Sequence, residues 1–289
     1  MNRKILLTGK NGQVGWELER TLSTLGQVIA LDQADMDLAD PDSIRKVIRA
    51  IKPGLIVNPA AYTAVDKAES EPELTLSING TAPGIMAEEA KRLDAALIHF
   101  STDYVFDGAT TTAYTEQDAP NPKSVYGSSK LAGELAIQAV GVPHLILRTS
   151  WVYGVRGKNF LLTMQRLARE RPSLNVVDDQ FGAPTWCRLL AEATAQIVAQ
   201  GQGDVAGHIQ QRTGVYHMTC AGQTSWHGFA RSILERETGP VADLRPIPSM
   251  DYPTPAARPH YSVLDNARLA DTFGIKLPDW AAALEIALA

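Results

Sequence analysis

The first half of the chain contains five short apolar runs, separated by stretches with the residue spacing of amphipathic helices. The runs cover residues 4–8, 28–31, 55–58, 96–101 and 144–150. Each is apolar almost throughout, which indicates a parallel strand covered on both faces rather than a strand with one solvated face. Helical spacing occurs at residues 13–25, 41–52 and 82–93. This alternation predicts an α/β fold with a doubly wound parallel sheet and right-handed crossovers.

Three glycines follow the first run, in the segment "TGKNGQVGWEL". Gly9, Gly12 and Gly15 form a GxxGxxG pattern directly before a predicted helix. Glycines let the backbone approach a pyrophosphate, and the helix N-terminus offers free N–H groups and a positive dipole end. Glycines also make ordinary tight turns, but the position at the first strand-to-helix connection favours a dinucleotide site.

Acidic residues near the second strand extend this hypothesis to the adenosine half of a cofactor. Asp32 ends the strand, at about the distance from the glycines where an acidic residue binds ribose hydroxyls. Its charge would repel a 2′-phosphate and so favours NADH over NADPH, although Lys10 would weaken this preference. Asp37 and Leu38 are expected near the adenine. The alternative is that Asp32 is only a turn residue.

Small residues follow the third strand in "NPAAYTAVDKAE". Ala60 and Ala61 would permit close passage of a cofactor at the carboxyl edge of the sheet, and Tyr62 and Thr63 would line that passage. A tightly packed connection would have the same composition.

The segment "VYGSSKLAGE" places Tyr126 and Lys130 four residues apart, with only small residues between them. In a helix they lie one turn apart on the same face, and Thr102 ends a neighbouring strand at the edge predicted for the cofactor. Hydride addition to a ketone produces an alkoxide, which needs a proton donor. We therefore expect Tyr126 as acid, with Lys130 lowering its pKa by roughly three units (about 4 kcal/mol) and binding the nicotinamide ribose. Thr102 would donate a hydrogen bond to the developing oxyanion.

After about residue 150 the pattern becomes irregular. Helical spacing recurs at residues 159–171 and 189–200, strands are expected at 174–179 and 214–219, and prolines concentrate between 240 and 260. We interpret residues 1–150 as a dinucleotide-binding Rossmann domain. Residues 151–289 then form mainly a smaller α/β substrate-binding lobe, with some segments returning to the main sheet.

Composition excludes several function classes. The formal net charge of −5 gives no support to nucleic-acid binding. No apolar run approaches the roughly 20 residues that cross a bilayer, and the N-terminus does not read as a signal peptide, so no membrane contact is expected. Cys187 and Cys220 lack a CxxC motif and are expected to be reduced in the cytoplasm. The six histidines show no metal-ligand spacing, so no metal site is predicted.

These motifs together resemble the extended short-chain dehydrogenase/reductase family and, within it, the dTDP-4-dehydrorhamnose reductases. The similarity runs from the first strand to about residue 265. It is carried by the segments "GKNGQVGWEL", "AAYTAVDKAESEPE", "STDYVFDG", "YGSSKLAGE", "RTSWVYG", "DDQFGAPT" and "YPTPAARP". The resemblance implies reduction of the carbon-4 ketone of dTDP-4-dehydro-L-rhamnose by NADH or NADPH, in dTDP-L-rhamnose synthesis for surface polysaccharide.

The resemblance also implies roles for individual residues. By matching positions, Gly12, Gln13 and Val14 would bind the pyrophosphate, and Asp32, Asp37 and Leu38 would surround the adenosine. Ala61, Tyr62 and Thr63 would follow the cofactor. Tyr126 would donate the proton, Lys130 would bind the ribose, and Thr102, Asp103 and Trp151 would contact the substrate.

Physical reasoning adds three candidate substrate contacts. Trp151 follows the fifth strand, where its indole would cover a sugar face, unless it is a core residue between domains. Arg258, in a proline-stiffened segment, is a candidate for the diphosphate, because a guanidinium matches phosphate oxygens. A salt bridge is the alternative for Arg258. Phe181 or Pro184 would press against the thymine, although turn roles are equally open.

One departure concerns a magnesium ion that bridges dimers in some members of the family. Glu17 occupies one ligand position, but Arg188 stands where another acidic ligand is expected, and an arginine does not ligate a cation. We therefore expect a monomer or weak homodimer and no metal in the chemistry.

Two alternative functions remain open from the sequence. One is a nucleotide-sugar epimerase or dehydratase of the same superfamily, which would return the hydride instead of consuming NAD(P)H. The other is a non-catalytic regulatory subunit that resembles the one binding methionine adenosyltransferase.

Overall fold

A central parallel sheet organises the molecule. The computed structural model describes residues 4–238 and 241–289, and its main sheet has six parallel strands in the order β10-β5-β4-β3-β1-β2. Their bounds are β1 Lys4–Leu7, β2 Gln27–Ala30, β3 Leu55–Asn58, β4 Ala96–Thr102, β5 His144–Thr149 and β10 Gly214–His217. The first five confirm the strands expected from the apolar runs. The sixth, β10, comes from the second half of the chain and pairs in parallel with β5.

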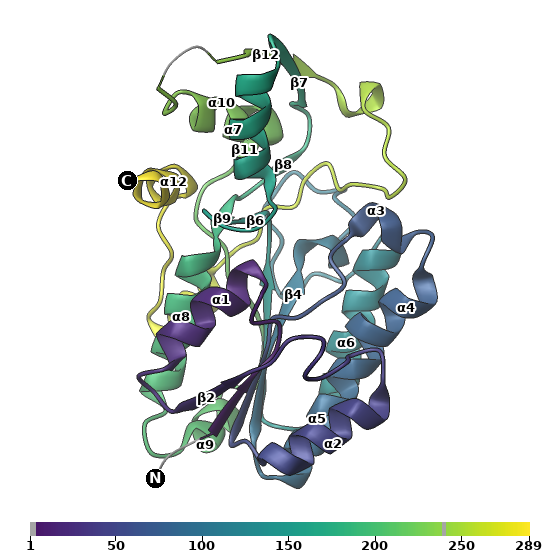
Figure 1. Cartoon of the computed structure of the whole chain (residues 1–289), viewed down its shortest axis with the longest axis vertical. Coiled ribbons are helices and arrows are strands. Elements are labelled where there is room, and N and C mark those ends of the chain that lie inside the picture. The colour runs from purple at the N-terminus through teal and green to yellow at the C-terminus, as the bar shows by residue number, and fades with distance from the viewer. Residues whose placement is uncertain (1–3, 239–240) are drawn as a thin grey trace.

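Helices cover both faces of this sheet (Figure 1). On one face, α1 (Gln13–Leu22) packs against α8 (Cys187–Gln200), which comes from the second half of the chain. On the other face, α5 (Ala82–Arg92) packs against both α2 (Pro41–Ile51) and α6 (Val125–Val140). The sheet is therefore doubly wound, as predicted.

Alternate residues of each strand enter two separate hydrophobic cores. On β1, Ile5 and Leu7 pack into the core beneath α1 and α8, whereas Leu6 packs into the core beneath α2 and α5. On β3, Val57 and Ile56 divide between the same two cores. Because successive side chains of a strand point to opposite faces, a strand covered on both sides is apolar at most positions, and its buried polar exceptions, such as Asn58 and His99, have hydrogen-bond partners. This explains the mainly apolar runs of the sequence.

A smaller lobe stands above the carboxyl ends of the strands. It contains a parallel pair, β7 (Ser173–Val177) and β12 (Asp243–Ile247), packed with α7 (Phe160–Glu170) and α10 (Trp226–Leu234) (Figure 1). Its core gathers residues such as Tyr153, Leu161 and Phe229. The lobe therefore has its own hydrophobic core and lies over the edge of the sheet at which parallel α/β folds bind ligands.

Short elements complete the described chain. They are α3 Val65–Ala68, α4 Pro72–Leu76, the π-helix η1 Ser77–Thr81, the 3₁₀-helix η2 Asp103–Val105, β6 Val152–Tyr153, β8 Phe181–Gly182, β9 Thr185–Trp186, α9 Val205–Gln210, β11 Thr224–Ser225, the 3₁₀-helix η3 Ser249–Asp251, α11 Ala267–Phe273 and α12 Trp280–Leu288. Within the described ranges, each helix falls short of the length and apolarity that a bilayer crossing requires.

Candidate active site

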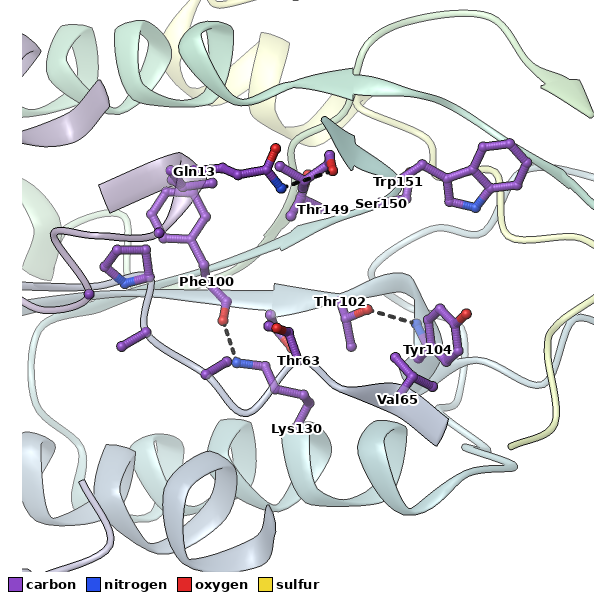
Figure 2. Close-up of a pocket in the computed structure, with 18 of the residues that line it drawn as sticks. Gln13, Thr63, Val65, Phe100, Thr102, Tyr104, Lys130, Thr149, Ser150 and Trp151 are labelled. Carbon is purple, nitrogen blue, oxygen red and sulfur yellow. Dashed lines mark hydrogen bonds between the residues drawn. The ribbon is translucent and has the colours of Figure 1, made fainter. Parts of the chain in front are cut away.

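A cavity of about 700 Å³ lies between the sheet edge and the smaller lobe. Its walls come from the glycine loop, from the segments after β3, β4 and β5, from α6, and from α10 of the lobe. Figure 2 shows Lys130 reaching up from α6 on one side, with Gln13 and Trp151 on the opposite side. Residues far apart in the sequence therefore converge on one cavity at the carboxyl edge of the sheet.

The glycine loop forms one end of this cavity. Gly9, Gly12, Gln13, Val14 and Gly15 all line it. The loop lies tightly against the start of α1, because a Cβ atom on Gly15 would lie 2.0 Å from the carbonyl oxygen of Gly9. The helix begins at Gln13 without a side-chain cap, so its first N–H groups are available for an anion. The loop therefore fits a pyrophosphate.

A second cavity, of about 260 Å³, adjoins the first and shares Gly9, Ala60 and Ala61 with it. The residues expected around adenosine line this cavity. They are Asp32, Asp37 and Leu38, and two residues expected along the cofactor path, Ala61 and Tyr62, line it as well. Thr63 lines the larger cavity. Together the two cavities form a path along the strand ends that matches the extended shape of a dinucleotide.

Asp32 is already engaged by neighbouring groups of the protein. One carboxylate oxygen accepts hydrogen bonds from the backbone N–H groups of Ala34 (3.0 Å) and Asp35 (3.3 Å). The other lies 3.3 Å from the Lys10 ammonium and accepts a bond from Asn11 at 3.3 Å. The Asp35 carboxylate, with Asp32, raises the pKa of Lys10. Asp32 is thus both a turn residue and part of the cavity wall, with a cation beside it.

Lys130 is buried and held from behind by β4. Ser124 caps α6 by accepting a hydrogen bond from Gly127 N–H at 3.1 Å, which fixes the first turn of the helix. The Lys130 ammonium donates to the carbonyl oxygen of Phe100 at 2.6 Å and lies 3.2 Å from Nε2 of His99 (Figure 2 shows the bond to Phe100). Burial lowers the pKa of Lys130 to about 8.

Tyr126 lies in the same cavity, but its ionisation differs from our expectation. Desolvation raises the pKa of Tyr126 to about 12, a hydrogen bond with Thr102 opposes that rise, and the charge of Asp103 adds to it. Lys130 is not among these influences, and its ammonium donates to the carbonyl oxygen of Phe100 on β4. The predicted lowering of the phenol pKa by Lys130 is therefore wrong for this structure. The phenol remains protonated at neutral pH, as a proton donor must.

Thr102 and Asp103 stand at the end of β4, beside Tyr126. The Thr102 hydroxyl donates to Asp103 Oδ1 at 2.9 Å and accepts from the backbone N–H of Tyr104 at 3.2 Å (Figure 2 shows the latter). Thr102 therefore has to leave Asp103 before it donates to a substrate oxyanion. Burial raises the pKa of Asp103 to about 6, although hydrogen bonds with Ser262 and Thr102 act to lower it.

Trp151 covers the lobe side of the cavity and is held in a strained conformation. Its φ is +46°, a left-handed value that costs energy for a residue with a side chain. The indole stacks on Trp226 with 3.5 Å between ring centroids, and a Cβ atom on Gly182 would lie 2.4 Å from it. Both tryptophans line the cavity, so Trp151 is a wall residue rather than an interior core residue.

The other residues expected to contact the substrate do not line the two cavities. Arg258 is not one of the described residues that line either cavity, and its guanidinium donates to Asp66 Oδ2 at 2.8 Å. Phe181 and Pro184 are likewise outside the described cavity walls. Arg258 forms the salt bridge that was its alternative, and its contact with a diphosphate stays a prediction.

Sequence reasoning missed several residues that shape the site. Asn79, within η1, accepts from the backbone N–H of Tyr62 at 2.8 Å and donates to its carbonyl at 3.1 Å and to Ser129 Oγ at 3.1 Å. Asn79 thus ties the cofactor path to α6. Trp226 and Lys158 also line the larger cavity. No spacing rule indicated them, because these contacts join elements that are distant in the sequence.

Arg188, one of the two positions discussed for a bridging metal, belongs to an ordinary ion pair. Arg188 donates to Glu192 at 2.9 Å, one turn along α8. Across residues 4–238 and 241–289, no three His, Cys, Asp or Glu side chains gather as candidate metal ligands.

Comparisons with known proteins agree with this architecture. The family model described as "RmlD substrate binding domain" matches residues 3–289. A dTDP-4-dehydrorhamnose reductase of Burkholderia thailandensis is 50% identical over 284 residues, which span 96% of this chain and 95% of the relative. One of Escherichia coli is 47% identical over 287 residues, spanning 96% and 94%. The crystal structure of a Bacillus anthracis dTDP-4-dehydrorhamnose reductase in complex with NADP matches with a TM-score of 0.91 at 32% identity, covering 99% of both chains. This chain therefore belongs to the dTDP-4-dehydrorhamnose reductase family.

Proposed function

We propose that this protein reduces the carbon-4 ketone of dTDP-4-dehydro-L-rhamnose to give dTDP-L-rhamnose, with NADPH or NADH as reductant. The observation that carries the proposal is the shared cavity: the glycine loop, Thr102, Tyr126 and Lys130 line one continuous space at the sheet edge. The nicotinamide ring, when bound, supplies a hydride to a carbonyl carbon. Relatives that this chain matches over 94–95% of their length bear this enzyme's name and support the substrate.

Each residue of the cavity has a role that its surroundings support. Tyr126 gives the phenolic proton to the oxygen of the reduced carbonyl, and solvent returns it afterwards. Lys130 uses one N–H bond for Phe100, and its remaining donors serve His99 and the nicotinamide ribose. Asp103 accepts from a sugar hydroxyl, since a pKa of about 6 leaves it mostly ionised at neutral pH. Trp151 covers the apolar face of the sugar.

The cofactor would extend along the strand ends. Gly12, Gln13 and Val14 hold the pyrophosphate at the start of α1, and Asp32 accepts from the adenosine ribose. Lys10 lies beside Asp32 and offers a cation to a 2′-phosphate. Both NADH and NADPH therefore suit this site, and the crystal structure of the Bacillus anthracis relative in complex with NADP supports the second.

We also propose the wider context of the enzyme. Residues 1–150 form the cofactor domain and residues 151–289 mainly the substrate lobe. Arg258 reaches the substrate diphosphate after leaving Asp66. Cytoplasmic localisation is supported by two free, buried cysteines. A monomer or weak homodimer is supported by the pairing of Arg188 with Glu192, which leaves a cation where a bridging metal would need a carboxylate.

The test is loss of nicotinamide absorbance with dTDP-4-dehydro-L-rhamnose made in situ, with NADH and NADPH in parallel. The wild type should oxidise one NAD(P)H per sugar. Tyr126→Phe should lower kcat by roughly 10²- to 10⁴-fold, with cofactor binding retained. Tyr252→Phe is the matched control, since Tyr252 is 60% exposed.

Two other outcomes would redirect the assignment. Turnover of a nucleotide-sugar without net NAD(P)H loss would indicate an epimerase or dehydratase. Cofactor binding without any turnover, together with a stable complex with methionine adenosyltransferase, would indicate a regulatory subunit.

A further inference from the structure

A row of buried polar side chains crosses the otherwise apolar sheet and ends at Lys130. The Thr8 hydroxyl donates to Asn58 Oδ1 at 2.6 Å, and Asn58 Nδ2 lies 3.0 Å from His99 Nδ1. His99 Nε2 in turn lies 3.2 Å from the Lys130 ammonium. All four side chains are at most 2% exposed. Buried polar groups of this kind are costly unless every donor meets an acceptor, so their hydrogen bonds constrain one another.

The register of neighbouring strands explains why these polar side chains lie next to one another. Asn58 and His99 are direct partners on β3 and β4, and Thr8 follows β1, the next strand of the sheet. All three continue the alternation that directs Leu6, Ile56 and Leu97 into the core beneath α2 and α5. The row therefore begins at Thr8, directly before the glycine loop, and meets α6 at Lys130.

Two hydrogen-bond patterns satisfy this row, and only the second requires Lys130 to be neutral, because an ammonium has no lone pair with which to accept. If Lys130 is an ammonium, it donates to His99 Nε2. The ring proton of a neutral His99 then lies on Nδ1, and the Asn58 amide turns its oxygen toward the ring. If Lys130 is a neutral amine, it accepts from Nε2–H, and Nδ1 accepts from Asn58 Nδ2. The orientation in which Thr8 donates to Asn58 Oδ1 belongs to the second pattern.

We propose that His99 is a positioning residue that holds the Lys130 ammonium toward the cofactor, and that its ring changes tautomer when Lys130 loses its proton. The role in turnover rests on the proposed function, whereas the tautomer change does not. Phe100 accepts from the Lys130 Nζ on the β4 side, and in the first pattern His99 Nε2, 3.2 Å away, accepts from it as well. These contacts leave one of its three N–H bonds for a ligand in the cavity.

The charges around Lys130 are consistent with a change of protonation near neutral pH. Burial lowers the pKa of Lys130 to about 8, and Glu134, one turn along α6, opposes this. Arg148 of β5 already binds Glu134. Burial and then the charge of Lys130 lower the pKa of His99 far below its usual value, so its ring stays neutral. Tyr126 and Asp103, discussed above, are the other ionisable groups of the nearby cavity wall.

The direct test is ¹⁵N NMR of the histidine rings in the full-length protein, titrated from about pH 6 to about pH 10. Loss of a signal pair in His99→Gln assigns the His99 resonances. We expect the proton on Nδ1 at the acidic end and on Nε2 at the alkaline end. One unchanged tautomer across the whole range would overturn the proposal. This readout requires no turnover, so it separates failure of the inference from failure of the proposed reductase.

A pair of variants tests the consequence for catalysis. The amide of His99→Gln reaches the place of Nε2 and offers Lys130 an acceptor, whereas that of His99→Asn reaches only the place of Nδ1. Losing one acceptor destabilises the ammonium, so His99→Asn should move the alkaline limb of kcat/KM about one pH unit lower. His99→Gln should keep it near the wild-type position. If both variants fold and the alkaline limbs of their kcat/KM profiles lie at the same pH, the positioning role is contradicted. If His99→Asn does not fold, the NMR titration of the wild type tests the proposal instead.

Discussion

A buried ion pair anchors the helix that carries Tyr126 and Lys130. Glu134 of α6 accepts from Arg148 of β5 through Nε at 2.9 Å and Nη2 at 2.6 Å, and from the Ser101 hydroxyl at 2.5 Å. The two side chains are only 1% and 4% exposed. Glu134→Leu leaves a guanidinium buried without a counter-charge, and arginine does not shed its proton. We expect a loss of about 3–5 kcal/mol in the free energy of unfolding.

The variant that removes the other partner, Arg148→Met, should destabilise the protein less than Glu134→Leu at acidic pH. Arg148→Met leaves a buried carboxylate, which is able to neutralise itself by taking up a proton. The double variant Glu134→Leu/Arg148→Met removes both charges and should recover most of the stability lost in Glu134→Leu. Since a typical domain is stable by only about 5–15 kcal/mol, the single variant should be markedly weakened.

Urea unfolding followed by far-UV circular dichroism measures these differences. The exposed pair Arg188–Glu192 provides the control, because both side chains are about half exposed (55% and 42%). Arg188→Ala should cost no more than about 0.5 kcal/mol. A cost below about 1 kcal/mol for Glu134→Leu, or a double variant as unstable as the sum of the single variants, would refute the reasoning.

Three further predictions follow from the site. Lys130 has a folded pKa of about 8 and an ordinary value of 10.5, so the unfolded state binds more protons between these values. The free energy of unfolding of the wild type should therefore rise by about 3 kcal/mol relative to that of Lys130→Met between about pH 8 and about pH 10.5. If denaturant titrations give a difference between the two proteins that does not change with pH, this prediction is wrong. Gly182→Ala should displace the Trp151 indole and raise KM for the nucleotide-sugar roughly tenfold, while cofactor affinity measured by fluorescence stays constant. Lys10→Ala should lower the NADPH-to-NADH ratio of kcat/KM by roughly five- to tenfold, because Asp32 loses its neighbouring cation; an unchanged ratio would exclude Lys10 from cofactor selection.

The sequence alone determined the sheet and the chemistry at its edge. Strands covered on both faces are apolar at most positions, so β1 to β5 were visible as mainly apolar runs. The glycine pattern and the four-residue spacing of Tyr126 and Lys130 are local, because one turn of helix or one loop defines them. Local geometry of this kind follows from spacing along the chain.

Only the tertiary structure decided how these residues are partnered. Lys130 turns to Phe100 and His99 of β4 rather than to Tyr126, so desolvation sets the phenol pKa. Arg258 pairs with Asp66, which is 192 positions away in the sequence. Burial and charge depend on which distant segments close over a side chain, and no spacing along the chain encodes that closure.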